Sequence, residues 1–416
     1  FFFSLPISMW RSLLTPRLST PAPPAAAAAR RGLRALVARS RKDVPEGEAA
    51  SSLVDVAAVS ALPRQDPKAD VEVEISHSTL NYKDAMIVLG QKGVVRDFPI
   101  TPGIDYAGVV ARSSSPLWRE GDAVVLTGNK AGQYFDGGYA ERATCRAEWL
   151  VAPPPALSLA QTMVVGTAGV TATMCVDYLQ RFGEVEPSHG PVLVTGAAGG
   201  LGQVAVALLH ARGFEVVAST GRAEALGEHL RALGASDVVG RLQPEPKPLG
   251  KQLWAGVVDS VGGATLAAAL AQTRYRGAVA SPGVAGGGGQ SARGAARDCA
   301  RLISPPPVWA RLGGELATSV YPFILRGVRL LGVDQTMPYD LEGYPDDPQR
   351  WDGCGGTAAA PTTYELKQSS LAVQLALGRT RIPLCSTIAS VQLSQCRSYS
   401  RGAPSGSACG RCSPSR

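Results

Sequence analysis

The sequence predicts a two-domain α/β protein in which a β-rich domain precedes a doubly wound parallel sheet. In the first third of the chain, short apolar runs are separated by Gly, Pro and Ser residues, a pattern typical of strands folded over into a barrel. Beyond Pro153 the apolar runs alternate with helical patterns, which indicates βα units and a parallel sheet. One of these later runs ends in glycines that lead straight into a helical segment, as in a βα unit of such a sheet.

The first domain is expected over residues 32–153. Its clearest strand covers residues 71–75, where apolar and acidic side chains alternate with the period of two that a half-buried strand requires. The proline run 153–155 marks the junction with the second domain. The other strands are expected at residues 33–38, 109–111, 123–126 and 149–151.

The second domain is expected over residues 154–286. Its strands are expected at residues 192–195, 214–218, 236–239, 256–259 and 277–280, and its helices at 201–210 and 223–233. Gly234 follows the second helix directly, where glycine commonly ends a helix. Residues 314–352 return to the folded part of the chain, and their apolar segments 320–325 and 328–333 are expected to rejoin the first domain.

The glycine-rich turn predicts a dinucleotide-binding site. A strand that ends in glycines and starts a helix directs free backbone N–H groups and the positive helix end at one point, which suits a pyrophosphate. The chain has 47 glycines, so the turn alone is weak support, but a second apolar strand about twenty residues further on supplies the expected context. The candidate pyrophosphate-binding residues are Ala198, Gly199, Gly200, Leu201 and Gly202.

The residues after the second strand predict which cofactor is bound. An NAD-preferring site usually places a carboxylate there to hold the ribose 2′-hydroxyl, whereas a 2′-phosphate requires Arg and hydroxyl donors. This chain offers Ser219, Thr220, Gly221 and Arg222. We therefore predict NADPH as the cofactor, the alternative being a surface turn with an incidental arginine.

Composition and charge exclude several other functions. No apolar run approaches the ~18–20 residues of a membrane span, so no membrane partner is expected. The formal net charge is +7, but residues 1–42 carry eight basic side chains and no acid, and the stretch from Gly353 is also basic. The part between them is acidic overall and has no basic stripe with interleaved aromatics, so no nucleic-acid partner is expected.

The N-terminal segment 1–31 is predicted to be an organelle transit peptide. From Met9 onward it is rich in Arg, Ser, Ala and Pro and contains neither Asp nor Glu, the composition of mitochondrial and plastid leaders. The alternative is a disordered tail, and a cytoplasmic protein if the segment is not a leader.

Several segments, taken in order, resemble the medium-chain dehydrogenase/reductase superfamily. These segments are residues 78–85, 99–108, 166–172, the glycine turn, 219–222, 254–259 and 322–328. The chain is most similar to the zinc-free quinone-oxidoreductase-like branch, and within it to the NADPH-dependent acrylyl-CoA reductases. The resemblance implies a GroES-like β-rich catalytic domain plus a Rossmann cofactor domain, and a homodimer.

The zinc sites of the superfamily's alcohol dehydrogenases are not expected here. Ile104 stands where those enzymes have the histidine of a Gly-His-Glu element, and residues 109–144 contain no cysteine. Isoleucine cannot ligate zinc, which needs N, S or O ligands. We therefore predict no metal.

The resemblance implies that NADPH delivers hydride to the β-carbon of a small 2-enoyl-CoA thioester and that the resulting enolate is protonated at the α-carbon. Donors near the thioester oxygen would lower the barrier. Reduction of a quinone or enone is the alternative within the enzymes. An alternative of another class is a non-catalytic NADPH-binding module.

Candidate catalytic residues lie in the segment 78–85. Tyr82 is expected to line the nicotinamide and to donate a proton, the alternative being a packing tyrosine with a satisfied hydroxyl. Asn81 and Asp84, with Lys83 between them, are expected to form a positioned polar network rather than an acid–base pair. By its family position, Thr167 would lie over the nicotinamide face; as an alternative it caps a helix.

Two stretches depart from the family pattern. Residues 287–313 form a Gly-, Arg- and Pro-rich insertion, either a disordered loop or translated intron sequence. Residues 353–416 form an atypical tail, which we expect to be aberrant through a shifted reading frame or an alternative 3′ exon. Since this region supplies a helix and the last strand of the catalytic domain in the family, we expect an unpaired sheet edge and poor folding of that domain.

Overall fold

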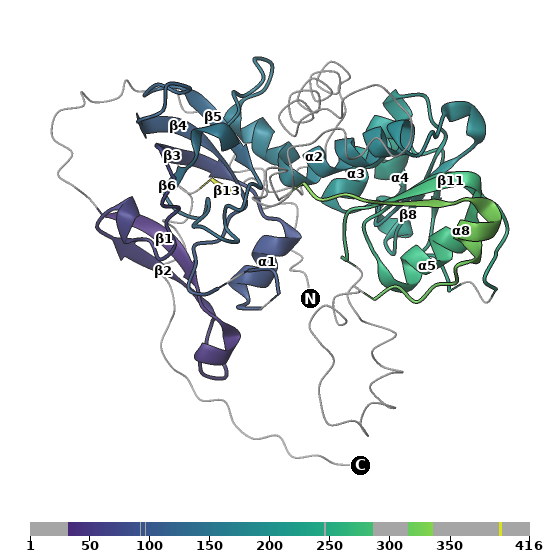
Figure 1. The fold of residues 1–416 in the computed structure, drawn as a ribbon, viewed down its shortest axis with the longest axis horizontal. Coiled ribbons are helices and arrows are strands. Elements are labelled where there is room, and N and C mark those ends of the chain that lie inside the picture. The colour runs from purple at the N-terminus through teal and green to yellow at the C-terminus, as the bar shows by residue number, and fades with distance from the viewer. Residues whose placement is uncertain are drawn as a thin grey trace, which may run out of the picture.

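The computed structural model describes residues 32–91, 93–95, 97–244, 247–285 and 315–335, together with the backbone of residues 391–392. It confirms the two predicted domains, which Figure 1 shows side by side, joined by a long helix. The predicted leader 1–31 and the insertion 287–313 lie outside the described residues, as does all of the tail except 391–392.

The first domain is built on an antiparallel sheet. In this sheet β3 (Val71–Ser78) pairs with β4 (Asp105–Ser113), and β4 pairs with β5 (Ala123–Thr127). On its other side β3 pairs with β6 (Arg142–Cys145). A separate hairpin of β1 (Leu33–Ala38) and β2 (Ser51–Val56) lies beside the sheet, and α1 (Tyr82–Val88) follows β3.

Local sequence explains this sheet well. Val71, Val73 and Ile75 are buried and pack in the domain core, while the intervening glutamates are more exposed, so the period-two prediction is confirmed. The backbone of β13 (Val391–Gln392) pairs with β3 at Ser78 and His77. The edge of β3 is therefore partly covered, against our expectation of an unpaired edge. The poor folding expected from the tail stays a prediction.

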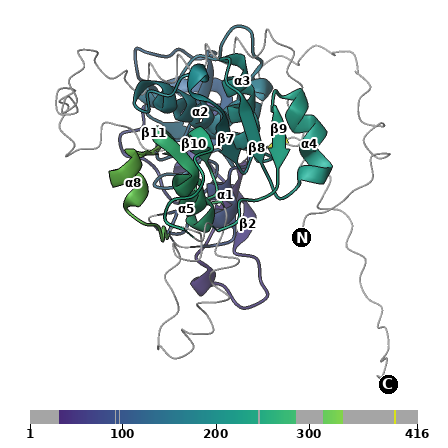
Figure 2. The same cartoon turned by 90° about the vertical axis from the view of Figure 1, so that its right-hand side faces the viewer.

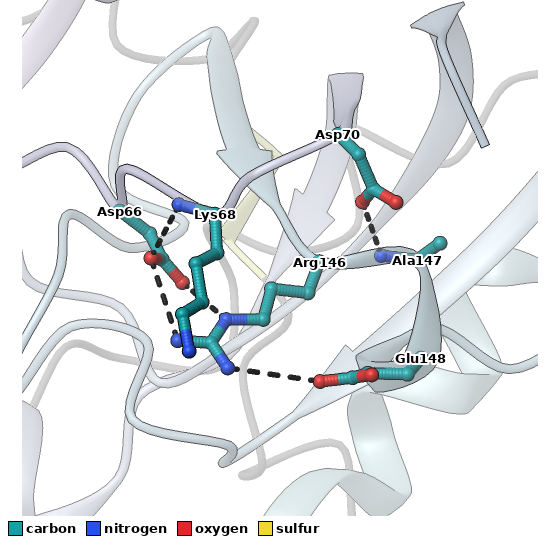
Figure 3. A network of polar contacts seen from close by, with 6 residues as sticks. All are labelled: Asp66, Lys68, Asp70, Arg146, Ala147 and Glu148. Atoms are coloured by element: carbon teal, nitrogen blue, oxygen red, sulfur yellow. Dashed lines mark hydrogen bonds and ion pairs between the residues drawn. The ribbon is translucent and has the colours of Figure 1, made fainter.

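The strand predicted at 149–151 is wrong, because its apolar residues are buried in a turn. Residues Ala147–Trp149 form a short 3-10 helix, and only Val151 bridges to β5. Figure 3 shows the cause: Asp70 accepts the Ala147 N–H at 2.7 Å, and Arg146 pairs with buried Asp66 through Nε and Oδ2 at 2.7 Å. The Arg146 guanidinium also lies 4.9 Å from the Trp149 ring centroid.

The second domain is a six-stranded parallel sheet in the order β12-β11-β10-β7-β8-β9. Its central strands are fully buried, as in a sheet covered on both faces. Helices α2, α3 and α4 cover one face, and α5 and α8 cover the other (Figure 2). The strands are β7 (Val192–Thr195), β8 (Val216–Ser219), β9 (Asp237–Val239), β10 (Trp254–Asp259), β11 (Thr273–Ser281) and β12 (Arg329–Gly332), and the helices are α2 (Leu159–Arg181), α3 (Gly200–Ala211), α4 (Ala223–Ala232), α5 (Gly263–Gln272) and α8 (Tyr321–Arg326).

The segments 320–325 and 328–333 do not rejoin the first domain as expected. They form α8 and β12, and β12 extends the parallel sheet beside β11. Burial explains this: Val328 and Phe323 pack into the same core as α5, which the isolated sequence could not indicate. The chain returns to the first domain only at Gln335, whose Nε2 donates to the Thr127 carbonyl at 3.2 Å.

The long helix α2 joins the two domains. Among the described residues it is the one helix long and apolar enough to cross a membrane, but 67% of that apolar window is buried, as in a core helix. The helix is interrupted at Gly166, whose φ is 47° and ψ is −159°. Its second half therefore begins at Thr167, whose N–H donates to Asp105 of the first domain.

Candidate functional site

The glycine turn after β7 leaves backbone donors uncapped. Gly199 is the N-cap residue of α3, and having no side chain it makes no capping hydrogen bond. The turn is closed by the Gly199 N–H, which donates to the Gly196 carbonyl at 2.8 Å, with Gly196 at a φ of 59°. The N–H groups of the first turn of α3 remain for an external anion.

Gly202 sets how closely α3 approaches that turn. A Cβ at this position would lie 2.5 Å from the Gly196 carbonyl oxygen and 2.6 Å from the Ala197 Cα. Both are backbone atoms, so only glycine permits the approach. Leu201 packs half-buried against the sheet core, and the Ala198 carbonyl accepts hydrogen bonds from Arg222 and Gln203. The five residues predicted from the sequence thus form one turn.

The end of β8 carries hydroxyls and a guanidinium but no carboxylate. Ser219 is buried, and its Oγ donates to the Gly240 carbonyl at 2.9 Å. Thr220 Oγ1 accepts the Arg222 N–H at 3.2 Å. The Arg222 Nη2 donates to the Ala198 carbonyl at 3.0 Å, so this side chain connects the β8 loop with the glycine turn. Gly221, between them, is exposed.

A second guanidinium, missed by the sequence reasoning, lies at the same loop. Arg241 follows β9 and is exposed. A Cβ on Gly221 would lie 2.5 Å from the Arg241 Nε, so the arginine lies directly against that glycine. The sequence signal was available, since Arg241 comes two residues after β9, and β9 lies beside β8 in the sheet.

A second cluster, in the first domain, joins Asn81 and Asp84 to a residue that sequence reasoning had not singled out, Asp105. The Asn81 N–H donates to Asp84 Oδ2 at 2.9 Å, and Asn81 Nδ2 donates to Asp105 Oδ2 at 2.9 Å. Asp84 Oδ1 accepts the Gly103 and Ile104 N–H groups at 3.1 and 3.0 Å. Asp84 and Asp105 are both buried. Asn81 and Asp84 therefore lie in one hydrogen-bonded network.

Thr167 completes this cluster from α2. Its N–H donates to Asp105 Oδ2 at 2.7 Å, and its hydroxyl donates to Asp105 Oδ1. A Cβ on Gly166 would lie 2.7 Å from Asp105 Oδ2, which explains the glycine. The helix-cap interpretation is thus right in its place but not in its capping group: the Asp105 carboxylate, rather than the threonine side chain, accepts the N–H and caps the second half of α2.

Burial perturbs both carboxylates. It raises the pKa of Asp84 to about 7, against the hydrogen bond from the Asn81 backbone, and the charge of Asp105 adds to the rise. Burial likewise raises the pKa of Asp105, while the Thr167 hydroxyl and N–H lower it. The bonds to both carboxylates come from N–H and O–H donors, so each carboxylate serves as an acceptor that fixes backbone and side chains.

Tyr82 and Lys83 differ sharply in environment. Tyr82 is the first residue of α1 and is 44% exposed, which does not fit a buried packing tyrosine. Lys83 is half-buried; burial lowers its pKa, and the nearby charges of Asp334 and Asp84 oppose the shift.

Ile104, which stands where the zinc alcohol dehydrogenases have a histidine, is buried, with an exposed fraction of 1%. In the part of the chain that the structure describes, no group of three His, Cys, Asp or Glu side chains could hold a metal ion.

Two protein families match the chain. The alcohol dehydrogenase GroES-like domain matches residues 67–155, and the zinc-binding dehydrogenase family matches residues 200–303. These matches correspond to the β-rich domain and to most of the parallel-sheet domain.

Relatives of known name are similar over most of their length. The probable acrylyl-CoA reductase AcuI of Escherichia coli K12 is 45% identical over 272 residues, 65% of this chain and 75% of the relative. The acrylyl-CoA reductase AcuI of Ruegeria pomeroyi is 44% identical over 288 residues, 68% and 79% of the two chains. The putative quinone oxidoreductase YhfP of Bacillus subtilis is 42% identical over 279 residues, 66% and 76%.

Solved structures of similar chains contain dinucleotides. E. coli K-12 YhdH with bound NADPH is 38% identical with a TM-score of 0.62, covering 81% of this chain and 87% of that one. B. subtilis YhfP with NAD bound is 36% identical with a TM-score of 0.62, covering 83% and 90%.

Proposed function

Because the chain belongs to the quinone-oxidoreductase-like branch of the medium-chain dehydrogenase/reductase superfamily, we propose that it is a zinc-independent reductase that uses NADPH to reduce the C=C bond of a small 2-enoyl-CoA thioester. The observation that carries the proposal is the pairing of an uncapped glycine turn with an arginine-bearing, carboxylate-free β8 loop. The similarity to an acrylyl-CoA reductase and to a probable acrylyl-CoA reductase, over three quarters of their length or more, supports the substrate class.

The cofactor fits the residues present. The uncapped start of α3 supports binding of the pyrophosphate by the N–H groups of Gly200, Leu201 and Gly202, and the position of Arg222 beside the glycine turn supports binding of the 2′-phosphate by its guanidinium. A 2′-phosphate would meet no carboxylate at the end of β8, whereas a 2′-hydroxyl would lack the acceptor that NAD sites provide. When bound, the nicotinamide supplies the hydride.

On the substrate side, Tyr82 is the residue we propose as proton or hydrogen-bond donor. The Asn81 side-chain amide donates to both Asp84 and Asp105, and the Thr167 hydroxyl donates to Asp105, which leaves neither group free to donate to a developing enolate. Tyr82 is exposed at the start of α1, directly after Asn81. The network thus positions the start of α1, where Tyr82 lies, and the start of the second half of α2.

The proposal is tested by NADPH oxidation with acryloyl-CoA and, in parallel, with 1,4-benzoquinone. Turnover of the thioester with NADPH but not NADH is the expected result. Turnover of the quinone alone favours quinone or enone reduction, and NADPH binding without any turnover favours a non-catalytic module. Tyr82→Phe should lower kcat by about 10²- to 10⁴-fold if the hydroxyl transfers a proton. Tyr275→Phe, a change at a 66% exposed tyrosine of the second domain, is the control.

We also propose a homodimer. β12 is the last strand of the described sheet on its side, and its Leu330 is 38% exposed, while Ile324 and Leu325 of the preceding α8 are 67% and 57% exposed. A second copy would cover these apolar side chains and pair the strand edge. Light scattering of the purified protein tests this; a monomer at micromolar concentration would refute it.

The organelle location is likewise proposed from residues 1–31 alone. A fusion of these residues to a fluorescent protein should enter mitochondria or plastids, and a fusion that stays cytoplasmic would refute the leader.

A further inference from the structure

A glutamine lies buried near the start of α3, among apolar residues. Gln203 is 6% exposed, and the two residues that follow it, Val204 and Ala205, pack in the domain core. A buried primary amide requires one partner for its oxygen and another for its nitrogen. Gln203 has both, since its Oε1 lies 2.8 Å from His229 Nε2 and its Nε2 donates to the Ala198 carbonyl at 3.2 Å. The amide therefore links helix α4 to the glycine turn.

The chemistry of the two partners fixes the direction of these bonds. A carbonyl oxygen only accepts, so the Gln203 nitrogen faces Ala198 and the Gln203 oxygen faces the imidazole. His229 Nε2 must therefore carry a proton and donate it to Gln203 Oε1. Without that donor, one end of a buried amide would have no partner, which disfavours the observed position of the glutamine side chain.

The peptide group between Ala198 and Gly199 is held at both of its edges. Its N–H donates to the Gly196 carbonyl at 2.8 Å. Its carbonyl accepts hydrogen bonds from Gln203 Nε2 and from Arg222 Nη2, at 3.2 and 3.0 Å. Gly199 has no side chain that restricts its backbone, so these bonds define the conformation of the turn. They also occupy a carbonyl oxygen whose partial negative charge would otherwise oppose an anion at the start of α3.

Helix α4 provides both of the side chains that control this carbonyl. Arg222 is the N-cap residue of α4, and His229 lies about two turns further along the helix. Arg222 donates to the carbonyl directly, but in the proposed complex its guanidinium also binds the 2′-phosphate. His229 acts through Gln203, and this contact does not compete with the phosphate.

We propose that His229 is a positioning residue for NADPH binding, because it holds the Gln203 amide against the Ala198 carbonyl and so keeps the glycine turn in the conformation that receives the pyrophosphate. The inference rests on the proposed NADPH dependence and deepens it, because it assigns the shape of the pyrophosphate site to a side chain of the next helix. When the imidazole donor is lost, a smaller fraction of the protein has the binding conformation of the turn, and the apparent Kd rises in proportion.

The test is calorimetric titration of the full chain with NADPH and with adenosine 2′-monophosphate, a probe that carries the 2′-phosphate but no pyrophosphate. His229→Phe keeps a ring and removes the donor. It should raise the Kd of NADPH by about 5- to 30-fold and leave the Kd of the monophosphate unchanged. His210→Phe, the same substitution at an exposed histidine near the end of α3, is the matched control and should change neither Kd.

Two further variants distinguish positioning of the turn from general support of α4. His229→Gln restores an N–H donor at about the reach of the imidazole Nε2, and should return the Kd of NADPH to within about threefold of the wild type. In a Gln203→Met background, His229→Phe should raise the Kd no further, because the amide through which His229 acts is gone. A second full increase in the double variant would overturn the inference.

The outcomes separate this inference from the cofactor proposal. If the wild type does not bind NADPH, the cofactor proposal fails and the inference fails with it. If the wild type binds NADPH and His229→Phe binds it as tightly, the inference alone is overturned. Equal weakening of NADPH and the monophosphate would also overturn it, because His229 would then support α4 and Arg222 rather than the glycine turn.

Discussion

Substituting Gly202 by alanine should weaken NADPH binding strongly without disrupting the helix that carries it. The new Cβ would lie 2.5 Å from the Gly196 carbonyl oxygen, whereas ordinary contact begins at 3.4 Å, so the start of α3 must withdraw by about 0.9 Å. Hydrogen bonds from α3 to a phosphate would stretch from about 2.9 Å to about 3.8 Å, beyond bonding distance. Two lost charge-assisted bonds correspond to about 3–6 kcal/mol, or about 10²- to 10⁴-fold in Kd.

Gly227→Ala is the matched control for this prediction. Gly227 also lies inside a helix, α4, but its Cβ would meet only the flexible Arg231 Nη1 at 3.3 Å and Val238 Cγ1 at 3.9 Å. Alanine should therefore stabilise the helix by up to about 1 kcal/mol and leave the Kd for NADPH unchanged.

Calorimetric titration with NADPH, after circular dichroism has shown that both variants are folded, provides the measurement. A Gly202→Ala protein whose Kd stays within about threefold of the wild type, less than 1 kcal/mol, would refute the reasoning. It would mean that the glycine is not required for the approach of α3 to the turn.

Three further changes test the rest of the fold. Gly166→Ala should cost about 3 kcal/mol or more in calorimetric melts, since strain adds to a clash with Asp105, whereas Gly327→Ala, at a φ of 60° with open space, should cost about 1 kcal/mol; equal costs would contradict the clash. Burial raises the pKa of Asp84 in the folded protein to about 7, against an ordinary value of 3.8. The stability that the protonated carboxyl contributes is therefore fully present below pH 3.8 and is lost as the pH rises to 7, so the stability of Asp84→Asn relative to the wild type should increase over this window. Parallel pH profiles of Tm for the two proteins would argue against this. Arg146→Met leaves the Asp66 carboxylate, 1% exposed, without its cation and should cost about 3–5 kcal/mol of unfolding free energy in denaturant melts; a loss below about 1 kcal/mol would contradict the burial argument.

The sequence predicted best those elements whose signals are local. The strand at residues 192–195 and the helix after the glycine turn have the predicted bounds within one residue, because an apolar run, a glycine turn and a helical pattern follow one another directly. The prediction at 149–151 failed because the apolar run does not form a strand. Its three residues, Trp149, Leu150 and Val151, are instead buried in a turn that hydrogen bonds to Asp66 and Asp70 hold in place. Those two partners lie about 80 residues away in the chain, where no local pattern could relate them.

The sequence predicted the glycine turn and β8 loop of the candidate site well. It predicted the cluster of Asn81, Asp84, Asp105 and Thr167 only in part. The cofactor turn is a contiguous segment, so its residues could be read in order. Asp105 was missed because its role depends on three elements that meet only in the fold: α1 through Asn81, the β5 end through Gly128, and α2 through Thr167. An acid at the start of a largely apolar strand was the available signal, since a buried carboxylate requires several donors.

Two helix starts differ in what caps them, and this difference explains why only one of them suits a cofactor phosphate. At Thr167 the second half of α2 begins with its N–H bonded to the Asp105 carboxylate, so its positive end is neutralised by the protein itself. At Gly199 the N-cap residue has no side chain, and α3 begins with its donors unused by any capping group. An anion from solution would have to displace a buried carboxylate at the first helix, whereas at the second it replaces only water. The placement of one aspartate and one glycine thus favours α3 over the second half of α2 for the proposed pyrophosphate.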